Sequence, residues 1–286
     1  MTIRVSPPKV FPVATGASKP PAEAGGSADA YRQTSFVLDD PVALVIEGLN
    51  AEGAIAQATA GSKYRTQRMA SAMVLWSRSW LARLQVLHSL QWGNYSACTP
   101  LVRSTADYQA SMLYLLRTEA VEWQEWLDAG GIAIAPEQHA TEFQLHAFRA
   151  AEILAAHDIL GPVYRATMDL SLSHFGSSLL FAAADSAPDH ISVTFGDRDF
   201  HMGLAELHLG WLLELGIAQG QALRAFDGVL AFGDGAGLPA FETRAAAWLK
   251  TTSRCRLEQT EVNGELRSLI HNWRREPRSA PKRILL

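Results

Sequence analysis

Residues 62–92, SKYRTQRMASAMVLWSRSWLARLQVLHSLQW, have the hydrophobic pattern that decides the fold class. Large apolar side chains recur there at steps of three and four residues, at Met69, Met73, Trp76, Trp80, Leu84 and Leu87. This spacing places them on one face of a helix with 3.6 residues per turn. The stretch therefore predicts a long amphipathic helix that buries one face against other helices.

Helical periodicity continues on both sides of this stretch. Residues 93–117, GNYSACTPLVRSTADYQASMLYLLR, carry a second apolar stripe at Cys98, Leu101, Thr105, Tyr108, Met112 and Leu116. Upstream, Asp39 or Asp40 before Pro41 is typical of a helix N-terminus. We expect a short helix that ends at Gly130-Gly131. Further helices are expected at about 139–160, 162–183, 201–217, 219–232, 239–252 and 254–274.

The remaining segments lack this periodicity. Residues 1–36 are rich in Pro, Ala, Gly and Ser, which indicates a disordered leader. The one strand-like run, HISVTFGDRDF at 190–200, is too short to form a sheet alone and is expected to be a loop or small hairpin. We therefore predict an all-α protein: a single multi-helix bundle domain at 37–274, a leader at 1–36 and a basic tail at 275–286.

Composition narrows the class of protein. The chain is 48% hydrophobic and 19% charged, and its net charge of −4 argues against a general nucleic-acid-coating protein. No apolar run is long enough to span a membrane, and the N-terminus lacks the apolar core of a secretory signal. The two cysteines, Cys98 and Cys255, lack CxxC spacing, so neither a disulfide framework nor a thiolate zinc site is expected. We expect a reducing, cytoplasmic compartment.

The charge is unevenly distributed. Residues 267–286 contain six Arg or Lys and one Glu, on an otherwise acidic chain. Such a tail is typical of a solvated end, or of one that contacts nucleic acid or an acidic partner.

Two of the predicted helices also carry polar residues that are candidates for a site. Arg103 and Asp107 lie one turn apart, with Tyr114 on the same face, opposite the stripe that contains Cys98. They are either a surface ion pair or part of a cleft or inter-helix groove. His174 shares a mostly apolar stripe with Val163, which is typical of a hydrogen-bonded core histidine; a general acid/base or RNA-contacting residue is the alternative.

Metal and cofactor motifs are weak. Glu142 and His146 have ligand-compatible spacing, but two ligands do not make a site, and no Glu-x-x-His pair occurs. The glycines of AFGDGAGLPAF, residues 231–241, follow a helical pattern rather than the strand that a phosphate-binding loop needs. We expect no metal and no cofactor.

Two segments resemble helices of an uncharacterised bacterial all-helical family related to HEPN-type proteins. GNYSACTPLVRSTADYQASMLYLL at 93–116 resembles the pattern small-residue–Leu-x-Arg-Ser-x-x-Glu, with Asp107 in place of Glu and with Pro100 inside the helix. YRATMDLSLSHFGSS at 164–178 resembles a later helix in which Leu-Ser precedes a His. Members that cleave RNA carry an Arg followed four to six residues later by a His. Arg83 and His88 have this spacing here, which is also expected by chance.

The resemblance implies an HEPN-like protein that binds or cleaves RNA, in a defence or toxin–antitoxin setting. In that hypothesis His174 is the acid/base, Arg103 stabilises phosphate charge and Asp107 orients Arg103. The alternative is a non-catalytic helical interaction or scaffold protein that forms a homo-oligomer, such as a homodimer, through the Arg103 face.

Overall fold

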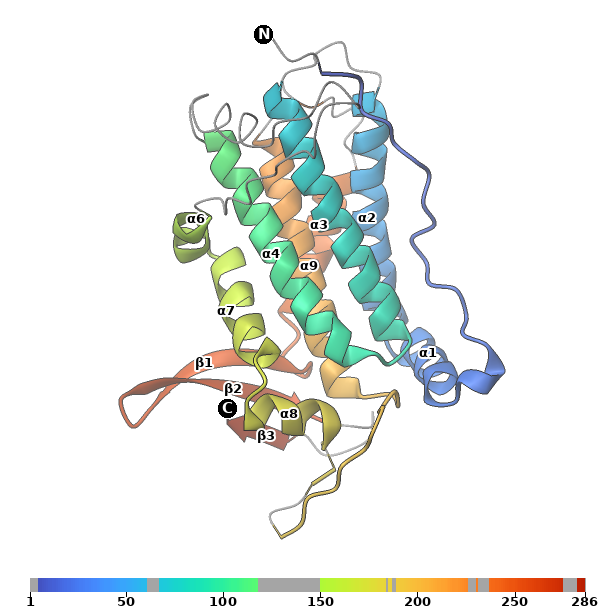
Figure 1. Cartoon of the computed structure of the whole chain (residues 1–286), viewed down its shortest axis with the longest axis vertical. Helices are drawn as coiled ribbons and strands as arrows, with labels where there is room; N and C mark the ends of the chain where they lie inside the picture. Colours follow the sequence, from blue (N-terminus) through green and yellow to red (C-terminus); the bar gives the residue numbers. More distant parts are fainter. Residues whose placement is uncertain are drawn as a thin grey trace, which may run out of the picture.

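The computed structural model describes residues 5–60, 67–117, 150–183, 185–186, 189–225, 230, 237–274 and 282–285. Its elements, in chain order, are η1 (Ala22–Ala24), α1 (Gly26–Val37), α2 (Asp39–Ala60), α3 (Gln67–Gln91), α4 (Tyr95–Arg117), α6 (Ala151–Ala156), α7 (Leu160–Ser171), α8 (Phe175–Ala182), α9 (Met202–Arg224), α10 (Gly237–Leu249), β1 (Arg256–Val262), β2 (Glu265–Trp273) and β3 (Lys282–Leu285). Helices make up the body of the molecule, and a small antiparallel sheet lies at one end (Figure 1). The predicted multi-helix bundle is confirmed.

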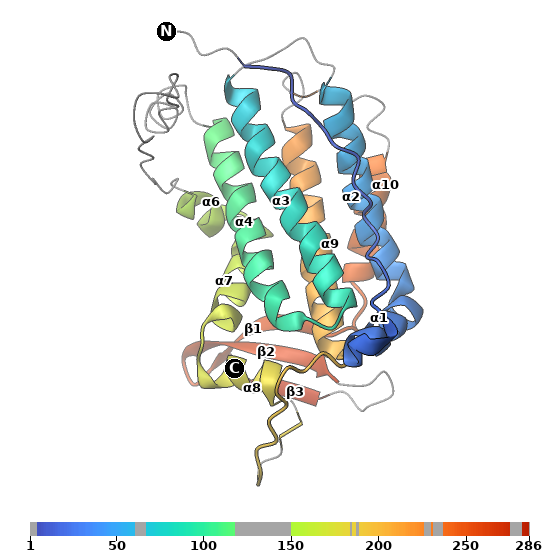
Figure 2. The same cartoon turned by 45° about the vertical axis from the view of Figure 1, so that its right-hand side comes forward.

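The long helices α2, α3, α4 and α9 run side by side, as Figures 1 and 2 both show. At their centre is α9, of whose 23 residues 20 are buried. The shorter helix α10 packs against α2 and α9, and α7 packs against α4. Because neighbours cover α9 on all sides, it is apolar around most of its circumference, unlike the amphipathic α4.

Several predicted helix boundaries are confirmed and others are wrong. Helix α2 begins at Asp39, two residues before Pro41, which was expected at its first position. The helices predicted at 201–217 and 219–232 form one continuous helix as far as Arg224. The helix predicted at 162–183 divides into α7 and α8. The helix expected before Gly130-Gly131 and residues 139–149 lie outside the described residues.

The helix predicted at 254–274 is wrong, because β1 and β2 form a hairpin there. Val262 pairs with Glu265, so that Asn263 and Gly264 make a two-residue turn with φ of 55° and 81°. Asn-Gly is the preferred sequence of such turns because both residues tolerate positive φ. This pair is the sequence signal for the hairpin. The basic tail contributes β3, which pairs antiparallel with β2.

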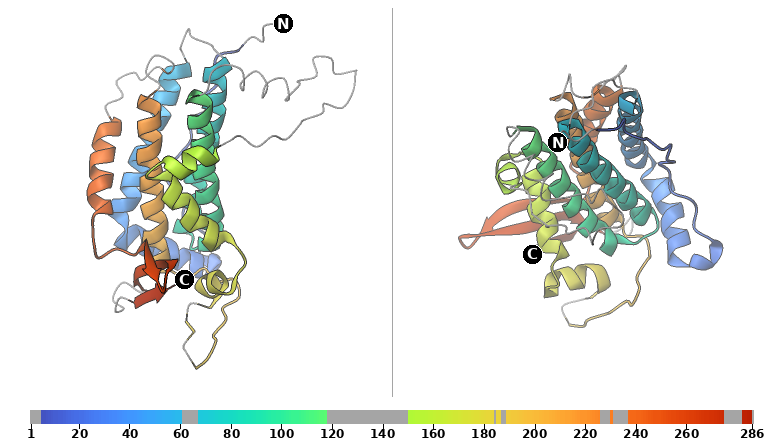
Figure 3. Two further views of the ribbon diagram at one scale, coloured as in Figure 1. Left: turned by 90° about the vertical axis from the view of Figure 1, so that its left-hand side faces the viewer. Right: turned by 45° about the horizontal axis from the view of Figure 1, so that its top comes forward.

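The sheet is attached to the N-terminal end of α9 (Figure 3). The Gly203 amide donates to the carbonyl of Arg274 at 2.8 Å, and the Trp273 ring lies 4.3 Å from the His201 ring, centroid to centroid. This attachment brings β1 beside α9 and α7.

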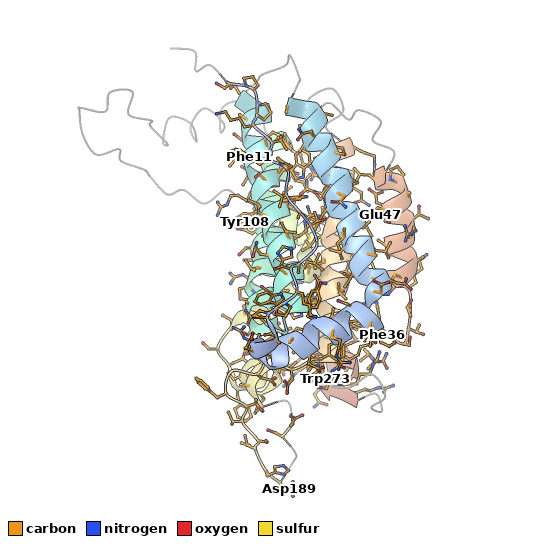
Figure 4. The ribbon with its side chains drawn as sticks, turned by 90° about the vertical axis from the view of Figure 1, so that its right-hand side faces the viewer. Phe11, Phe36, Glu47, Tyr108, Asp189 and Trp273 are labelled. Carbon is orange, nitrogen blue, oxygen red and sulfur yellow. The ribbon has the colours of Figure 1, made fainter. Side chains whose placement is uncertain are left out.

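The predicted boundary at residue 37 is also corrected. Residues 26–37 form α1, and the segment before it runs along the outside of the bundle in Figures 2 and 4. Thr15 is buried there, and its hydroxyl donates to Asn50 of α2 at 3.0 Å. The Trp92 indole, at the end of α3, donates to the carbonyl of Ser18. The leader therefore contributes packing and hydrogen bonds to the helical body.

Candidate functional site

The face of α4 that carries Arg103 packs against α7. The Arg103 guanidinium donates to the Tyr164 hydroxyl at 3.4 Å and lies 5.4 Å from the centre of its ring. Arg103 thus contacts Tyr164 rather than Asp107. Asp107 is exposed and lines a cavity of about 360 Å³ beside Tyr164 and Arg165. Of the two alternatives, the structure favours an inter-helix contact over a surface ion pair.

His174 is neither a core residue nor part of this face. It is exposed and forms the N-cap of α8, where its Nδ1 accepts a hydrogen bond from the Ser177 amide at 3.2 Å. Its Nε2 lies 2.9 Å from the carbonyl oxygen of Asp169, which can only accept. This geometry places the ring proton on Nε2, and both ring nitrogens are engaged by backbone groups.

The three predicted site residues do not form one cluster. Within the described ranges, no hydrogen bond, ion pair or cavity joins His174 to Arg103 or Asp107. Their catalytic role stays a prediction. Arg83, the arginine of the Arg-then-His spacing, is buried and forms a two-pronged ion pair with Glu52, at 2.7 and 2.5 Å.

A different cavity brings charged side chains from separate elements together. It has a volume of about 290 Å³ and lies between α7, α9 and β1. Its apolar wall includes Leu207 and Trp211 of α9 and Leu257 of β1. Its polar lining includes Glu214 and three arginines, Arg165, Arg254 and Arg256. A volume near 300 Å³ is at the lower end of the range for small-molecule sites.

Arg254 enters this cavity from the segment that precedes β1. Its Nε donates to the carbonyl of Leu249 at 3.0 Å and its Nη1 to that of Cys255 at 3.2 Å. The guanidinium lies directly over Gly210 of α9, where a Cβ atom would be 2.9 Å from Nη1. Gly210 therefore provides the space in which a cation lies against the central helix. Burial lowers the pKa of Arg254, an effect that Glu214 opposes.

The other two arginines differ in their partners. Arg256 forms an ion pair with Glu258 at 2.7 Å and donates to the Thr252 carbonyl. Arg165, on the exposed side of α7, makes no hydrogen bond or ion pair with any residue that the structure describes. A guanidinium without a carboxylate partner, at the wall of a cavity, is available to an anion.

Glu214 is the titratable group of the cavity. It lies on α9 one turn after Gly210 and Trp211, and it is partly buried. Burial raises the pKa of its carboxyl to about 7, although the nearby Arg254 acts in the opposite direction. A carboxyl group with a strongly raised pKa in a cavity, beside a partly desolvated arginine, is a typical feature of functional sites.

Other candidate chemistry is limited. In the part of the chain that the structure describes, no group of three or more His, Cys, Asp or Glu is placed to hold a metal ion, and none of the helices there is long and apolar enough to cross a membrane. Glu142 and His146 lie outside that part. Burial raises the pKa of the Cys98 and Cys255 thiols, Cys255 to about 12.

Comparison with protein-family models, with curated proteins and with solved structures finds no match to this chain. The site is therefore argued from its own geometry. Sequence reasoning missed it because Arg165, Glu214 and Arg254 are far apart in the chain. The local signal is the presence of carboxylates, Glu214 among them, within the mostly apolar helix α9.

Proposed function

We propose that this protein binds a small anionic ligand in the cavity between α7, α9 and β1. The observation that carries the proposal is that Arg165 and Arg254 both line one small cavity. Arg165, which also borders the cavity beside Asp107, has no partner among the described residues. Arg254 is positioned in advance by two carbonyl groups and by the space over Gly210. Preorganised guanidinium groups bind carboxylate and phosphate oxygens strongly because little side-chain freedom is lost.

The test is titration calorimetry with three probe anions, benzoate, benzenesulfonate and inorganic phosphate. Loss of one charge-assisted hydrogen bond costs about 1.5–3 kcal/mol, so Arg165→Gln is expected to weaken binding roughly 10- to 100-fold. The matched control is Arg267→Gln, which removes an exposed arginine of β2 that pairs with Glu265 outside the cavity. Absence of binding by all three probes, or equal weakening by both variants, would contradict the proposal.

RNA is the anion that the family resemblance suggests, and binding or cleavage of RNA is our second proposal. The observation that favours it is the exposure of His174, which leaves the imidazole within reach of a polymer. The test is RNA cleavage in EDTA by the wild type, His174→Ala and Arg103→Ala. Cleavage that both folded variants lose would support it, and RNA left intact by the wild type would end the ribonuclease hypothesis.

Self-association is the alternative from the sequence, and a separate surface favours it. Exposed apolar side chains gather on α8 and the loop after it, whose tip is near Asp189 (Figure 4). Phe175 is 71% exposed, Val193 71% and Phe195 103%. Surfaces of this kind often mark protein interfaces. Sedimentation at increasing concentration, with Phe195→Ser compared with Phe36→Ser on α1, tests whether this surface forms a homo-oligomer.

A further inference from the structure

Glu214 and the ligand proposed above both interact with the Arg254 guanidinium. Without a ligand, the Glu214 carboxylate is the anion nearest to Arg254 inside the cavity, and Arg254 acts on its titration. An anion bound in this small cavity would place a second negative charge beside the Glu214 carboxylate. In a partly desolvated site, the repulsion between two such charges is removed when one of them binds a proton, as in paired carboxylates.

We infer that the cavity binds an organic monoanion together with one proton from solvent, and that Glu214 holds this proton. The inference rests on the proposed anion-binding function and adds a ligand class and a coupling to pH. The carboxylate or sulfonate of the ligand lies between Arg165 and Arg254. Its apolar part lies against Trp211 and Leu207. The Glu214 O–H then donates to an oxygen of the bound anion, where an ionised Glu214 would repel it.

The shape and polarity of the cavity favour an organic anion over an inorganic one. Trp211 and Leu207, which are 5% and 2% exposed, line the cavity together with Val163 and Leu257 as its apolar part. A bare phosphate would make no use of these apolar side chains, whereas the ring of an aromatic carboxylate would contact them. The volume of about 290 Å³ is at the lower end of the range for small-molecule sites.

The charged groups around Glu214 on other elements do not provide a competing proton site. From β1, Arg256 is paired with Glu258. Elsewhere on α9, Glu206 is held by the Cys255 amide and by Arg274 of the segment after β2.

The helices on the far sides of α9 hold their charges in pairs as well. Arg83 of α3 is paired with Glu52 of α2, and Glu242 of α10 with Arg224. From α7, Arg165 is the remaining charge in the cavity, so Glu214 is its one carboxylate in the described chain. A proton taken up on binding is therefore assigned to Glu214.

The test is benzoate and benzenesulfonate binding by calorimetry, because neither probe titrates between pH 6.5 and 8.5. Titration at pH 7.5 in two buffers of different ionisation enthalpy counts the protons taken up. The wild type is expected to take up between about one half and one proton per anion, and its Kd is expected to rise up to tenfold per pH unit above about 7. Glu214→Gln, which mimics the protonated form, is expected to bind both probes with no proton uptake and with a Kd that changes less than about twofold over this range.

Glu261→Gln is the matched control, because Glu261 is an exposed carboxylate of β1 outside the cavity. It is expected to behave as the wild type. Binding without proton uptake by the wild type would overturn this inference and leave the anion site standing. No binding of either probe, or of phosphate, would overturn the anion site itself. The number of protons that the wild type takes up per bound anion tests the coupling even if Glu214→Gln does not fold.

Discussion

Buried polar residues in the bundle are paired by geometry that fixes their charge state. His208 is fully buried, with Nδ1 at 2.7 Å from the Leu204 carbonyl oxygen and Nε2 at 2.9 Å from the Thr99 hydroxyl. A carbonyl oxygen only accepts, so Nδ1 carries the proton, and Nε2 accepts from Thr99. Burial lowers the pKa of His208 to about 4, so that the folded protein keeps this ring neutral where an unfolded chain would protonate it.

His208 should make the protein sensitive to acid. Between pH 6.5 and about 4 the unfolded chain binds more protons at this residue, so the free energy of unfolding falls as the pH falls through that window. The loss amounts to up to about 3 kcal/mol at the acid end. We expect His208→Gln to lose less stability than the wild type between pH 7.5 and 4.5 in urea titrations. His190→Gln changes an exposed histidine and should keep the wild-type dependence of the unfolding free energy on pH. An equal pH dependence for all three proteins would contradict the role given to His208.

The Glu52–Arg83 pair shows what an unpaired buried charge would cost. Both residues are buried, and the Trp76 indole donates to Glu52 as well, at 2.9 Å. Glu52→Gln would leave the Arg83 cation unpaired and should lower the free energy of unfolding by about 3–5 kcal/mol. The double variant Glu52→Gln/Arg83→Met should be more stable than Glu52→Gln alone, because the unpaired charge is gone. Glu47→Gln, from the exposed pair with Arg244, should cost less than about 1 kcal/mol.

At the scale of elements, the attachment of α10 depends on two glycines. Phe241 is 1% exposed, and its ring lies between Gly48 of α2 and Gly216 of α9. A Cβ atom at either glycine would lie 2.8 Å from ring carbons of Phe241. Absence of a side chain at both positions therefore lets a phenyl ring fill the space between the two helices, which explains why Gly216 does not end α9.

Gly216→Ala should destabilise the protein by about 1–3 kcal/mol, because the enclosed ring cannot move away without cost. Gly53→Ala is the matched change on α2, where nothing lies within 4 Å of an added Cβ, and it should stabilise by about 0.5–1 kcal/mol. Thermal and urea unfolding measure both. In the double variant Gly216→Ala/Phe241→Leu, the smaller leucine side chain should recover part of the lost stability. An unchanged stability of Gly216→Ala would refute this packing.

At the scale of the whole molecule, the cavity exists because the sheet is fastened to the bundle. Glu206 of α9 accepts the Cys255 amide at 2.7 Å and a hydrogen bond from Arg274 at 2.7 Å, and these two residues flank the hairpin. This carboxylate fixes where β1 begins and thus where Arg254 and Arg256 face α7. Burial raises the pKa of Glu206, and the Cys255 amide and Arg274 oppose that effect.

Glu206→Gln should loosen the hairpin more than the helices. The amide can accept one hydrogen bond but presents N–H groups to the second donor, and it leaves Arg274 without its counter-ion. We expect amide hydrogen exchange in β1 and β2 to accelerate about tenfold or more, while exchange in α3 and α4 changes less. Glu261→Gln, which changes an exposed carboxylate on β1, is the control. Uniform acceleration in all elements would indicate global destabilisation instead.

Local pattern was sufficient for the helices of the bundle. The stripes of α3 and α4 were predicted with the right faces: Trp76, Leu84 and Leu87 are buried, as are Cys98 and Met112. Helix α2 begins at Asp39, within two residues of the start that its aspartates and Pro41 predict, because such signals act within one turn of chain. The hairpin is encoded just as locally, by Asn263-Gly264, although the apolar spacing at 254–274 also fits a helix.

By itself, the sequence determined the helical class, the apolar face of α3 and α4 and the start of α2, because each depends on residues within a few positions of one another. Only the tertiary structure decided that α9 is the buried centre, that Arg103 contacts Tyr164 rather than Asp107, and that His174 caps a separate helix. It alone brought Arg165, Glu214 and Arg254 to one cavity. Those contacts join residues tens of positions apart, and which of many apolar faces pack together is settled by the packing of the complete chain rather than by the pattern of any one segment.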